Sequence, residues 1–453
     1  MPYFILQHLL AITAFILGAN AALAVALPGP VTDADYYHDG SPNSKKVELG
    51  RALFFDKILS GNKNVSCATC HSPLVASGDG LSLGVGQRGQ FLGPMRITET
   101  ASGKILSRIG RNAPPLFNLG AKEFVKLNWQ GRHELRTNGT LNLPSAQFTP
   151  AGLENVLAGQ ALFPLLNAHE MLGQLGENEV VSAAPQGTPP GPALFPWSWG
   201  ALVTRLRGIP QYVDMFKAAF TDVVSVDSMN IAHVGNAISA FQATAFRADK
   251  SPYDRYLRGE TDALSSAQLR GMDTFYNKAN CASCHSGKFQ TDHNFHSIAM
   301  PQFGPGVKSS ATRKQEDVGR REMVADDKLK YKFRTPPLRN VAMTAPYGHT
   351  GAYSTLEGVI KHHLDPVNSF LNWDRTQVSM PSRSDLDVTD FFIMDDPVAR
   401  LAITNANELA PSTLTDSEIK DIVDFLYALT DPSSFDLSRQ VPESVPSGLA
   451  IGD

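Results

Sequence analysis

Cysteine, long apolar runs and clusters of like charge are all scarce in this chain of 453 residues. The 40 Lys and Arg residues nearly balance the 44 Asp and Glu residues, and no basic or acidic run stands out, so nucleic acid is not indicated as a partner. Beyond the first two dozen residues, no segment stays apolar for long enough to cross a membrane. No stretch alternates apolar and polar residues strongly enough to predict a sheet, so we expect a mostly α fold.

The first two dozen residues resemble a secretory signal peptide. A nearly unbroken apolar run over 4–18 is followed by small residues, with candidate cleavage points after Ala21 and Ala24. No Lys or Arg precedes Lys45, which is unusual, and the alternative is an uncleaved anchor; the run is, however, shorter than the ~20 residues that span a bilayer. No cysteine follows it, which excludes a lipoprotein anchor. We therefore expect residues 1–24 to be a signal peptide and the mature protein to be periplasmic, without stable membrane insertion.

The four cysteines form two C-x-x-C-H motifs, at 67–71 and 281–285. This spacing is typical of c-type haem attachment, in which both sulfurs bond to the haem and the histidine ligates the iron. A zinc site and a thioredoxin-like redox pair are the alternatives, but neither requires a histidine directly after each pair. We predict two covalently bound haem c groups, and no cysteine remains for a disulfide. The predicted attachment and proximal-ligand residues are Cys67, Cys70, His71, Cys281, Cys284 and His285.

A similar segment precedes each motif, which indicates a weak internal repeat. Apolar spacing predicts helices over 47–55 and 268–276, each ending in an aromatic pair before its C-x-x-C-H motif. We therefore expect two cytochrome c-like haem domains packed against each other. The break at Ser251-Pro252 gives the expected boundaries: an N-terminal peroxidatic haem domain at 25–249, a C-terminal electron-transfer haem domain at 250–440, and a tail at 441–453.

Two further helices and two loops can be predicted. Residues 229–246 have a helical apolar face with Asn230 as the N-cap, and Thr415-Asp416-Ser417-Glu418 is a capping box that begins another helix. Glycine is frequent over 78–94, and proline and glycine are frequent over 185–196, so both segments are predicted to be loops.

Several longer motifs lie between and after the haem motifs. They occupy residues 49–56, 111–114, 129–132, 160–171, 334–340 and 344–349. Together they resemble the bacterial di-haem cytochrome c peroxidases, including the MauG-type enzymes, over nearly the whole mature chain. In that family the N-terminal haem is peroxidatic and the C-terminal haem passes electrons to it. The resemblance implies reduction of hydrogen peroxide to water with electrons from a small redox protein such as a c-type cytochrome.

The resemblance also implies roles for individual residues near the first haem. Glu170 matches the family's distal glutamate, and a carboxylate over the iron can take a proton from one peroxide oxygen and give one to the other. Gln160 matches a distal glutamine that orients water or peroxide, and Pro164 matches a proline of the same pocket. Trp129 matches a tryptophan between the haems that helps to carry an electron or hole. Arg132 is a candidate partner for a haem propionate.

A calcium ion between the domains is implied as well. Asn112, Thr344 and Pro346 match the positions that hold it, through one side-chain oxygen and two backbone carbonyls. Ligation by oxygen alone suits Ca²⁺.

Two positions depart from the peroxidases that need reductive activation. Val85 aligns with their distal histidine, and valine cannot ligate iron, so we predict an open or water-bound peroxidatic haem. His363 aligns with the family's axial methionine, which is a tyrosine in MauG itself, and His362 is the alternative ligand. Leu356, Ile360 and His363 share one helical face. Because methionine raises the potential of a haem, histidine in its place should lower it.

Three functions follow from these observations. The leading hypothesis is a periplasmic peroxidase. The second keeps the same haems but oxidises a protein or organic substrate, as MauG does. The third is a di-haem electron carrier, which would have no use for an acid-base group at Glu170. Members of this family are often dimers, so a homodimer is compatible with the resemblance.

Overall fold

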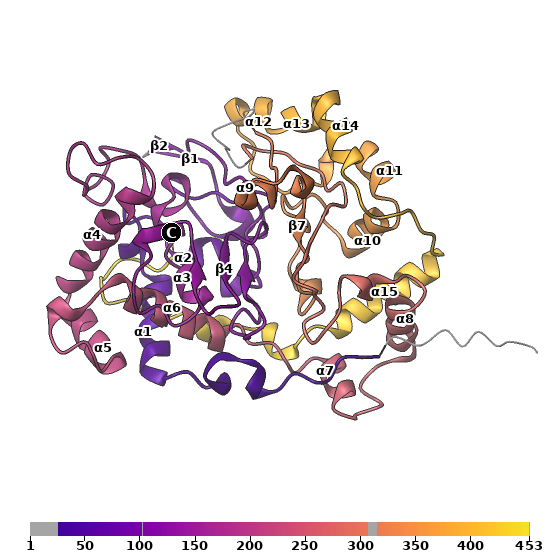
Figure 1. The fold of residues 1–453 in the computed structure, drawn as a ribbon, viewed down its shortest axis with the longest axis horizontal. Helices are drawn as coiled ribbons and strands as arrows, with labels where there is room; N and C mark the ends of the chain where they lie inside the picture. The colour runs from indigo at the N-terminus through magenta and orange to yellow at the C-terminus, as the bar shows by residue number, and fades with distance from the viewer. Residues whose placement is uncertain (1–25, 102, 307–314, 453) are drawn as a thin grey trace, which may run out of the picture.

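The computed structural model describes residues 26–101, 103–306 and 315–452 (Figure 1). The mostly α fold class is confirmed, and the predicted signal peptide lies outside the described residues. The α-helices are α1 (Ser44–Phe55), α2 (Cys67–Cys70), α3 (Val156–Gln160), α4 (Phe195–Arg207), α5 (Pro210–Ala219), α6 (Ile231–Ala245), α7 (Pro252–Leu257), α8 (Ser266–Tyr276), α9 (Arg321–Val324), α10 (Leu356–Leu364), α11 (Pro366–Leu371), α12 (Ser384–Asp390), α13 (Phe392–Asp395), α14 (Pro397–Asn405) and α15 (Asp416–Ala428).

The strands in the described ranges are short and pair only with antiparallel neighbours. They are β1 (Glu99–Thr100), β2 (Gly103–Lys104), β3 (Lys126–Leu127), β4 (His133–Leu135), β5 (Leu141–Asn142), β6 (Phe295–His296) and β7 (Phe333–Arg334). The sheets have the orders β1-β2, β3-β4-β5 and β6-β7, and Phe295 lies opposite Arg334 in the last of them. These small sheets lie between helices and form no layer of their own.

The N-terminal half is built around the crossing of α1 and α6. Asn43 caps α1 and Asn230 caps α6, as the sequence predicted for the second of these. The helices come very close at Gly50, where a Cβ atom would lie 1.9 Å from the Ala237 carbonyl oxygen. Phe54 then packs on Phe241 with ring centres 5.1 Å apart. The first C-x-x-C-H motif follows this crossing.

The C-terminal half repeats the same packing with α8 and α15. A Cβ atom at Gly271 would lie 1.8 Å from the Asp421 carbonyl oxygen, and Phe275 packs on Phe425 at 5.3 Å. Thr415 caps α15 in the predicted capping box. Each half therefore has a helix that carries a glycine and then an aromatic pair, and a C-x-x-C-H motif follows after that helix ends. The repeat detected in the sequence is present in the packing.

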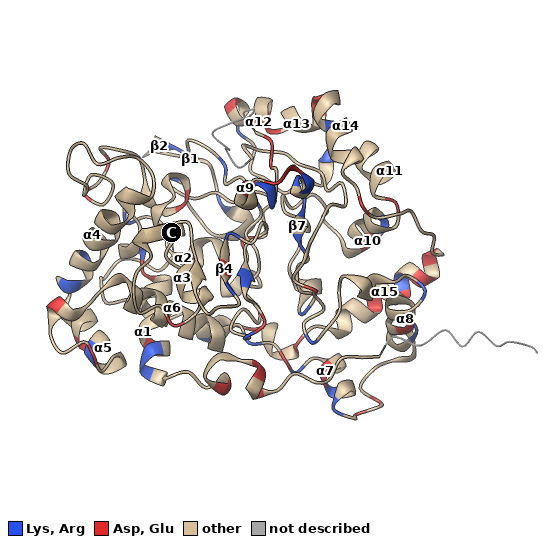
Figure 2. Cartoon of the chain, viewed as in Figure 1, with Lys and Arg blue, Asp and Glu red and all other residues tan. Residues whose placement is uncertain are grey.

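The two halves are joined by segments distant in sequence (Figure 1). The C-terminal tail returns to the N-terminal half, where the Lys57 ammonium donates to the Gly452 carbonyl at 2.9 Å and the Ser447 hydroxyl donates to Asp56 at 2.6 Å. Lys and Arg gather around α9, β7 and β4 in the middle of the molecule (Figure 2). One of the ion pairs between the halves joins Arg111 to Asp317 at 2.6 Å.

The predicted loop over 185–196 ends earlier than expected. Its first residues are irregular, but Pro196 lies in the first turn of α4. Proline is tolerated there because the N–H it lacks would have no partner inside the helix.

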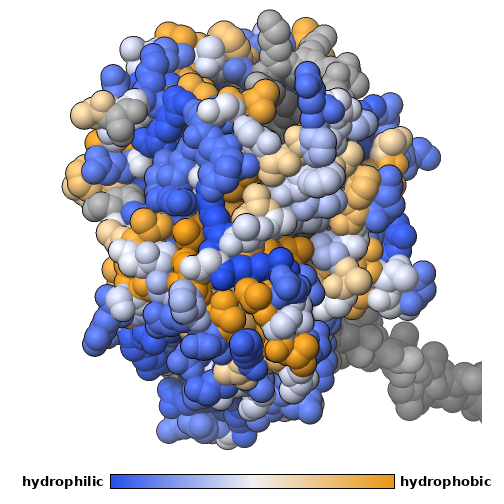
Figure 3. Space-filling view, turned by 90° about the vertical axis from the view of Figure 1, so that its left-hand side faces the viewer, coloured by the Kyte–Doolittle hydropathy of each residue, from blue (hydrophilic) through white to orange (hydrophobic). Residues whose placement is uncertain are grey.

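The molecular surface is mixed in character. The side that carries α4 and α5 shows apolar patches among larger hydrophilic areas (Figure 3). Among the residues that the structure describes, no helix has both the length and the apolar character needed to cross a bilayer.

The two glycine crossings generate a stability prediction. Gly50→Ala and Gly271→Ala should each lower the free energy of unfolding by about 1–3 kcal/mol, because the new methyl group collides with backbone of the facing helix. Gly200→Ala in α4 is the matched control, since nothing lies within 4 Å of its Cβ position and helix propensity alone favours alanine by up to about 1 kcal/mol. Urea unfolding of the three variants measures the difference. Equal stability of all three would show that the helices do not cross this closely.

Candidate functional site

The first C-x-x-C-H motif forms the short helix α2 and the residue after it. The His71 Nδ1 atom lies 3.1 Å from the Ser77 carbonyl oxygen. A carbonyl only accepts hydrogen bonds, so Nδ1 carries the proton and Nε2 keeps the lone pair that can ligate a metal. Burial lowers the pKa of His71, which favours the neutral ring that ligation requires.

The second motif has the same arrangement. The His285 Nδ1 atom lies 3.1 Å from the Gln290 carbonyl oxygen, which again leaves Nε2 as the ligating atom. Burial, reinforced by the nearby His363, lowers the pKa of His285 to about 4. Both proximal candidates are thus oriented by a backbone carbonyl a few residues further along the chain.

His363 on α10 faces His285. Their ring centres are 6.2 Å apart. A metal–imidazole bond of about 2.0–2.1 Å, with the ring centre about 1.1 Å behind the nitrogen, gives about 6.2–6.4 Å for two imidazoles on opposite sides of one metal. The His363 Nδ1 atom donates to the Val359 carbonyl at 2.7 Å, so its Nε2 is the atom left for ligation.

His362, the alternative ligand, is fully buried and occupied on both sides. Its Nε2 lies 2.7 Å from the Ile298 carbonyl oxygen and its Nδ1 lies 2.7 Å from the Tyr353 hydroxyl. Because both ring nitrogens already have partners, the geometry favours His363 over His362 as the sixth ligand.

A buried arginine also fits a haem-binding role. Arg334 is 8% exposed and donates only to the carbonyls of Asn128 and Thr335, with no carboxylate at ion-pair distance in the described part of the chain. Burial lowers the pKa of Arg334 to about 10. A buried cation requires an anionic partner, and a haem propionate would supply one. Sequence reasoning named Arg132 for this purpose and missed Arg334.

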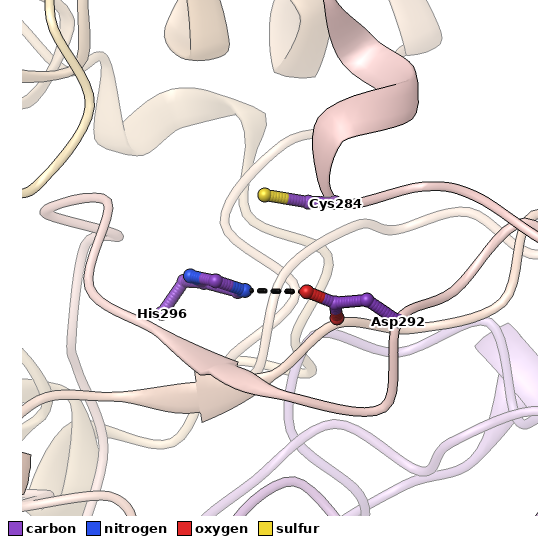
Figure 4. Close-up of side chains that lie close together, drawn as sticks. All are labelled: Cys284, Asp292 and His296. Carbon is purple, nitrogen blue, oxygen red and sulfur yellow. Dashed lines mark hydrogen bonds and ion pairs between the residues drawn. The ribbon is translucent and has the colours of Figure 1, made fainter. Parts of the chain in front are cut away.

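Near the second motif, Cys284, Asp292 and His296 converge (Figure 4). One ligand atom from each lies within 4.8 Å of the others, and the His296 Nε2 atom lies 2.8 Å from Asp292. The cysteine, however, is the second of its C-x-x-C-H motif, and a sulfur in a thioether bond to haem is no longer a thiolate ligand. The Asp292–His296 pair therefore lies beside the haem attachment point rather than forming a separate metal site.

Glu170 lies in a single π-helical turn, Ala168–Leu172. Asn167 begins the turn and also donates from its amide to the Glu170 carboxyl at 2.8 Å. Burial raises the pKa of Glu170 to about 7, and the charge of Arg132 opposes that shift. The turn lies beside the segment that leads into the first motif, since the Gly61 amide donates to the Met171 carbonyl at 2.7 Å. A carboxyl with a pKa near neutrality can both accept and return a proton.

Gln160 and Pro164 lie on the segment that leads to this turn. Gln160 is the last residue of α3, and Pro164 begins a short 3-10 turn, Pro164–Leu166. Both are half-buried. Within the described ranges, no hydrogen bond joins Gln160 to Glu170.

Val85 lies on the other side of the Glu170 turn. It is fully buried in an apolar cluster with Leu81 and Ile105. The next residue, Gly86, presses against the turn so closely that a Cβ atom would lie 2.1 Å from the His169 carbonyl oxygen. The position that the sequence comparison predicted to lack a distal histidine is therefore an aliphatic side chain packed in an apolar cluster.

Trp129 lies at the junction of the two halves. Its indole Nε1 donates to the Asn112 carbonyl at 3.1 Å, and its own carbonyl accepts from the Arg334 amide at 2.7 Å. One residue is thus hydrogen-bonded to segments on either side of the boundary.

A small hollow contains part of the predicted calcium set. Asn112, Thr344 and Ala345 line it, whereas Pro346 follows Ala345 through a cis peptide bond. The Asn112 amide donates to the Leu81 carbonyl at 2.8 Å, which leaves its Oδ1 as the acceptor available for a cation.

Asp79 lines the same hollow and was missed by sequence reasoning. It is 1% exposed, and its Oδ2 has no hydrogen-bond partner, while Oδ1 accepts from the Leu81 amide at 3.0 Å. A carboxylate that lines the same hollow as Asn112, Thr344 and Ala345 adds a further oxygen donor of the kind that Ca²⁺ prefers. The Asp79-Gly80 pair just after the first haem motif is the signal that could have identified it.

Comparisons with known proteins agree with this geometry. Residues 44–262 match the family described as di-haem cytochrome c peroxidase, CCP_MauG. The methylamine utilization protein MauG of Methylorubrum extorquens is 30% identical over 322 residues, which are 71% of this chain and 69% of the relative. The cytochrome c551 peroxidase of Pseudomonas aeruginosa is 30% identical over 364 residues, 75% of this chain and 82% of the relative.

Solved structures show the same architecture. A MauG-like protein associated with microbial copper homeostasis aligns with a TM-score of 0.57 at 25% identity, covering 94% of this chain and 98% of its own. The di-haem peroxidase BthA of Burkholderia thailandensis has the same fold, with a TM-score of 0.56 at 21% identity, 95% coverage of this chain and 97% of its own. The chain belongs to the di-haem cytochrome c peroxidase and MauG family.

The pairing of His285 with His363 generates a spectroscopic prediction. In the holoprotein, His363→Ala should convert the low-spin ferric signal of the second haem to high-spin, because the sixth ligand is lost. His362→Ala is the matched control from the adjacent position and should keep that signal low-spin. Electron paramagnetic resonance of the two ferric variants distinguishes them. A high-spin second haem in His362→Ala alone would reverse the ligand assignment.

Proposed function

We propose that this protein is a periplasmic di-haem c-type peroxidase that reduces hydrogen peroxide to water with electrons from an external small redox protein. The observation that carries the proposal is the placement of Glu170: its half-buried carboxyl is held by Asn167, in a turn whose Met171 carbonyl accepts from the Gly61 amide just ahead of the first C-x-x-C-H motif. Burial raises the pKa of this carboxyl to about 7. Family membership supports the same activity: relatives include cytochrome c peroxidases from Pseudomonas aeruginosa and Escherichia coli. Two cytochrome c-like haem domains, joined by the Trp129 segment, complete the proposal.

The overall reaction consumes one peroxide, two electrons and two protons and yields two waters. When bound, the haems supply the iron at which the O–O bond breaks and the sites at which electrons are held. Glu170 as carboxylate accepts the proton of one peroxide oxygen and returns it to the other, which leaves as water. Asn167 holds the carboxyl in place, and the Arg132 charge favours its ionised form. Gln160 orients the peroxide.

Electrons would enter at the haem on His285 and reach the haem on His71 by way of Trp129. The indole is hydrogen-bonded to Asn112, and its backbone to Arg334, so it is fixed between the halves. A fixed aromatic ring between two redox centres shortens each electron-transfer step.

A MauG-like oxidation of a protein or organic substrate is the second candidate, and His363 favours it. Histidine in place of methionine lowers the potential of the second haem, which weakens electron uptake from a high-potential cytochrome. Rapid turnover with peroxide and a reduced c-type cytochrome supports the peroxidase. Negligible turnover, with an oxidised state of the holoprotein that persists after peroxide, supports the second candidate.

We further propose a Ca²⁺ ion in the hollow beside Trp129, held by Asn112, Thr344 and Pro346 with Asp79. The Asn112 side-chain oxygen and the two backbone carbonyls are the predicted ligands, and the orphaned Asp79 Oδ2 adds a negative charge. The Asn112 backbone also receives the Trp129 indole, so the ion would steady the contact between the halves.

The acid-base role of Glu170 generates the central functional prediction. Glu170→Gln should lower kcat/KM for peroxide by about 10²–10⁴-fold, because glutamine cannot exchange the proton. In the native protein, activity should rise with pH up to about 7 and then level off, since burial keeps Glu170 protonated, and unable to accept a proton, below that pKa. Steady-state kinetics over a pH series measures both effects.

Glu260→Gln is the matched control, since Glu260 forms a surface ion pair with Arg255 in the other half of the molecule. Its activity and pH profile should stay close to those of the native protein. Full activity of Glu170→Gln would refute the proposed mechanism.

The calcium proposal is tested by affinity rather than activity. After chelator treatment of the holoprotein, isothermal titration should show Ca²⁺ binding at least tenfold weaker in Asp79→Asn and in Asn112→Ala than in the native protein. Asp227→Asn, whose side chain is 88% exposed, is the control and should bind normally. Unchanged affinity in both site variants would remove calcium from this hollow.

A further inference from the structure

Arg96 has one of the largest fully buried side chains of the described residues, with 1% exposure. Its guanidinium lies inside the loop formed by residues 85–91. It donates hydrogen bonds to the carbonyl oxygens of Val85, Gly86, Gly89 and Phe91. Buried carbonyls that lose such donors are strongly unfavourable. The loop is therefore folded around this one side chain.

The loop depends on that support because its backbone is strained. Arg88 and Phe91 have φ angles of 70° and 68°, in the left-handed region that residues with a Cβ atom rarely adopt. Such conformations persist only where surrounding contacts enforce them. The carbonyls that Arg96 gathers flank both strained positions.

The same loop is pressed against the turn that carries Glu170. A Cβ atom at Gly86 would lie 2.1 Å from the His169 carbonyl oxygen and 2.9 Å from the Glu170 Cα. The Gln87 amide donates to the His169 carbonyl at 2.9 Å, and its side chain donates to the Met171 carbonyl. The backbone on both sides of Glu170 is thus held by residues 86 and 87.

The segment that leads into the loop at 85–91 is anchored at Ser82 in the other half of the molecule. The Ser82 amide donates to the Ser379 carbonyl at 2.7 Å, and the Ser82 hydroxyl donates to the Gly351 carbonyl at 2.7 Å. With one end fixed by Ser82 and the far end wrapped around Arg96, the loop has little freedom to move away from Glu170.

We propose that Arg96 is a positioning residue that holds the Glu170 carboxyl in its catalytic place by way of the loop at 85–91. The inference rests on the proposed role of Glu170. The guanidinium holds the loop backbone through hydrogen bonds to its carbonyls. Arg96 itself lies inside the loop and acts through Gly86 and Gln87.

The test uses the holoprotein with Arg96→Met, which removes the four hydrogen bonds, and Gly86→Ala, which pushes the loop off the turn and leaves the Arg96 side chain itself unchanged. Both should lower kcat for peroxide at least tenfold and shift the pH midpoint of activity by at least half a unit, because Glu170 changes its surroundings. Arg96→Lys should lie between Arg96→Met and the native protein, since lysine reaches fewer carbonyls. Thermal unfolding and haem absorbance verify that each variant is folded and loaded.

Arg51→Met is the matched control. Arg51 also donates to three backbone carbonyls, those of Arg439, Gln440 and Val441, but in the C-terminal tail. The Arg51→Met variant should lose stability and keep the native pH midpoint of activity. If Arg96→Met does not fold, the kcat and pH midpoint of Gly86→Ala decide whether the loop positions Glu170. The inference would be overturned if Gly86→Ala and Arg96→Met both keep the native kcat and pH midpoint while Glu170→Gln is inactive. If Glu170→Gln is itself active, the proposed function is overturned as well.

Discussion

A backbone carbonyl that accepts the Nδ1–H of a histidine is the interaction on which both candidate haem centres depend. The Ser77 and Gln290 carbonyls fix His71 and His285 in the same tautomer, with Nε2 left to ligate iron. The proximal sides of the two centres are therefore alike. Their difference lies on the opposite side, where the second histidine meets another imidazole, His363, at 6.2 Å.

For the opposite side of the first centre we propose a carboxyl and an aliphatic loop. Glu170 is held in a one-turn π-helix between Asn167 and Gly86, and burial keeps its pKa near neutrality. Such turns are rare and occur mostly at functional sites. Val85 contributes no ligand, and the loop around it is fixed by hydrogen bonds to Arg96. Under the proposed function, proton transfer belongs to the first centre and electron entry to the second, and Trp129 is hydrogen-bonded to segments of both halves.

Much of the fold could be predicted because its determinants are local. The Asn230 cap, the Thr415 capping box and the glycine-aromatic helices before each motif all depend on residues within one or two turns. The haem motifs were predictable for the same reason, since attachment needs only a five-residue pattern. The preference for His363 over His362 agrees with a helical face visible in the sequence.

The residues that were missed depend on contacts distant in sequence or on loop conformation. Asp79 is informative only because folding buries one of its oxygens without a partner. Arg334 is recognisable as an unpaired cation only because no carboxylate of the described residues lies at ion-pair distance from it, and Arg96 only once the loop closes around it. The docking of the tail through Lys57 and Gly452 spans almost the whole chain. No local pattern encodes such burial.

The asymmetry between the two centres is tested most directly by the electron paramagnetic resonance spectrum of the resting ferric holoprotein at neutral pH. The account predicts one high-spin signal, from the haem on His71, and one low-spin signal, from the haem shared by His285 and His363. Two low-spin signals with no high-spin component would contradict it, because the first centre would then be closed to peroxide.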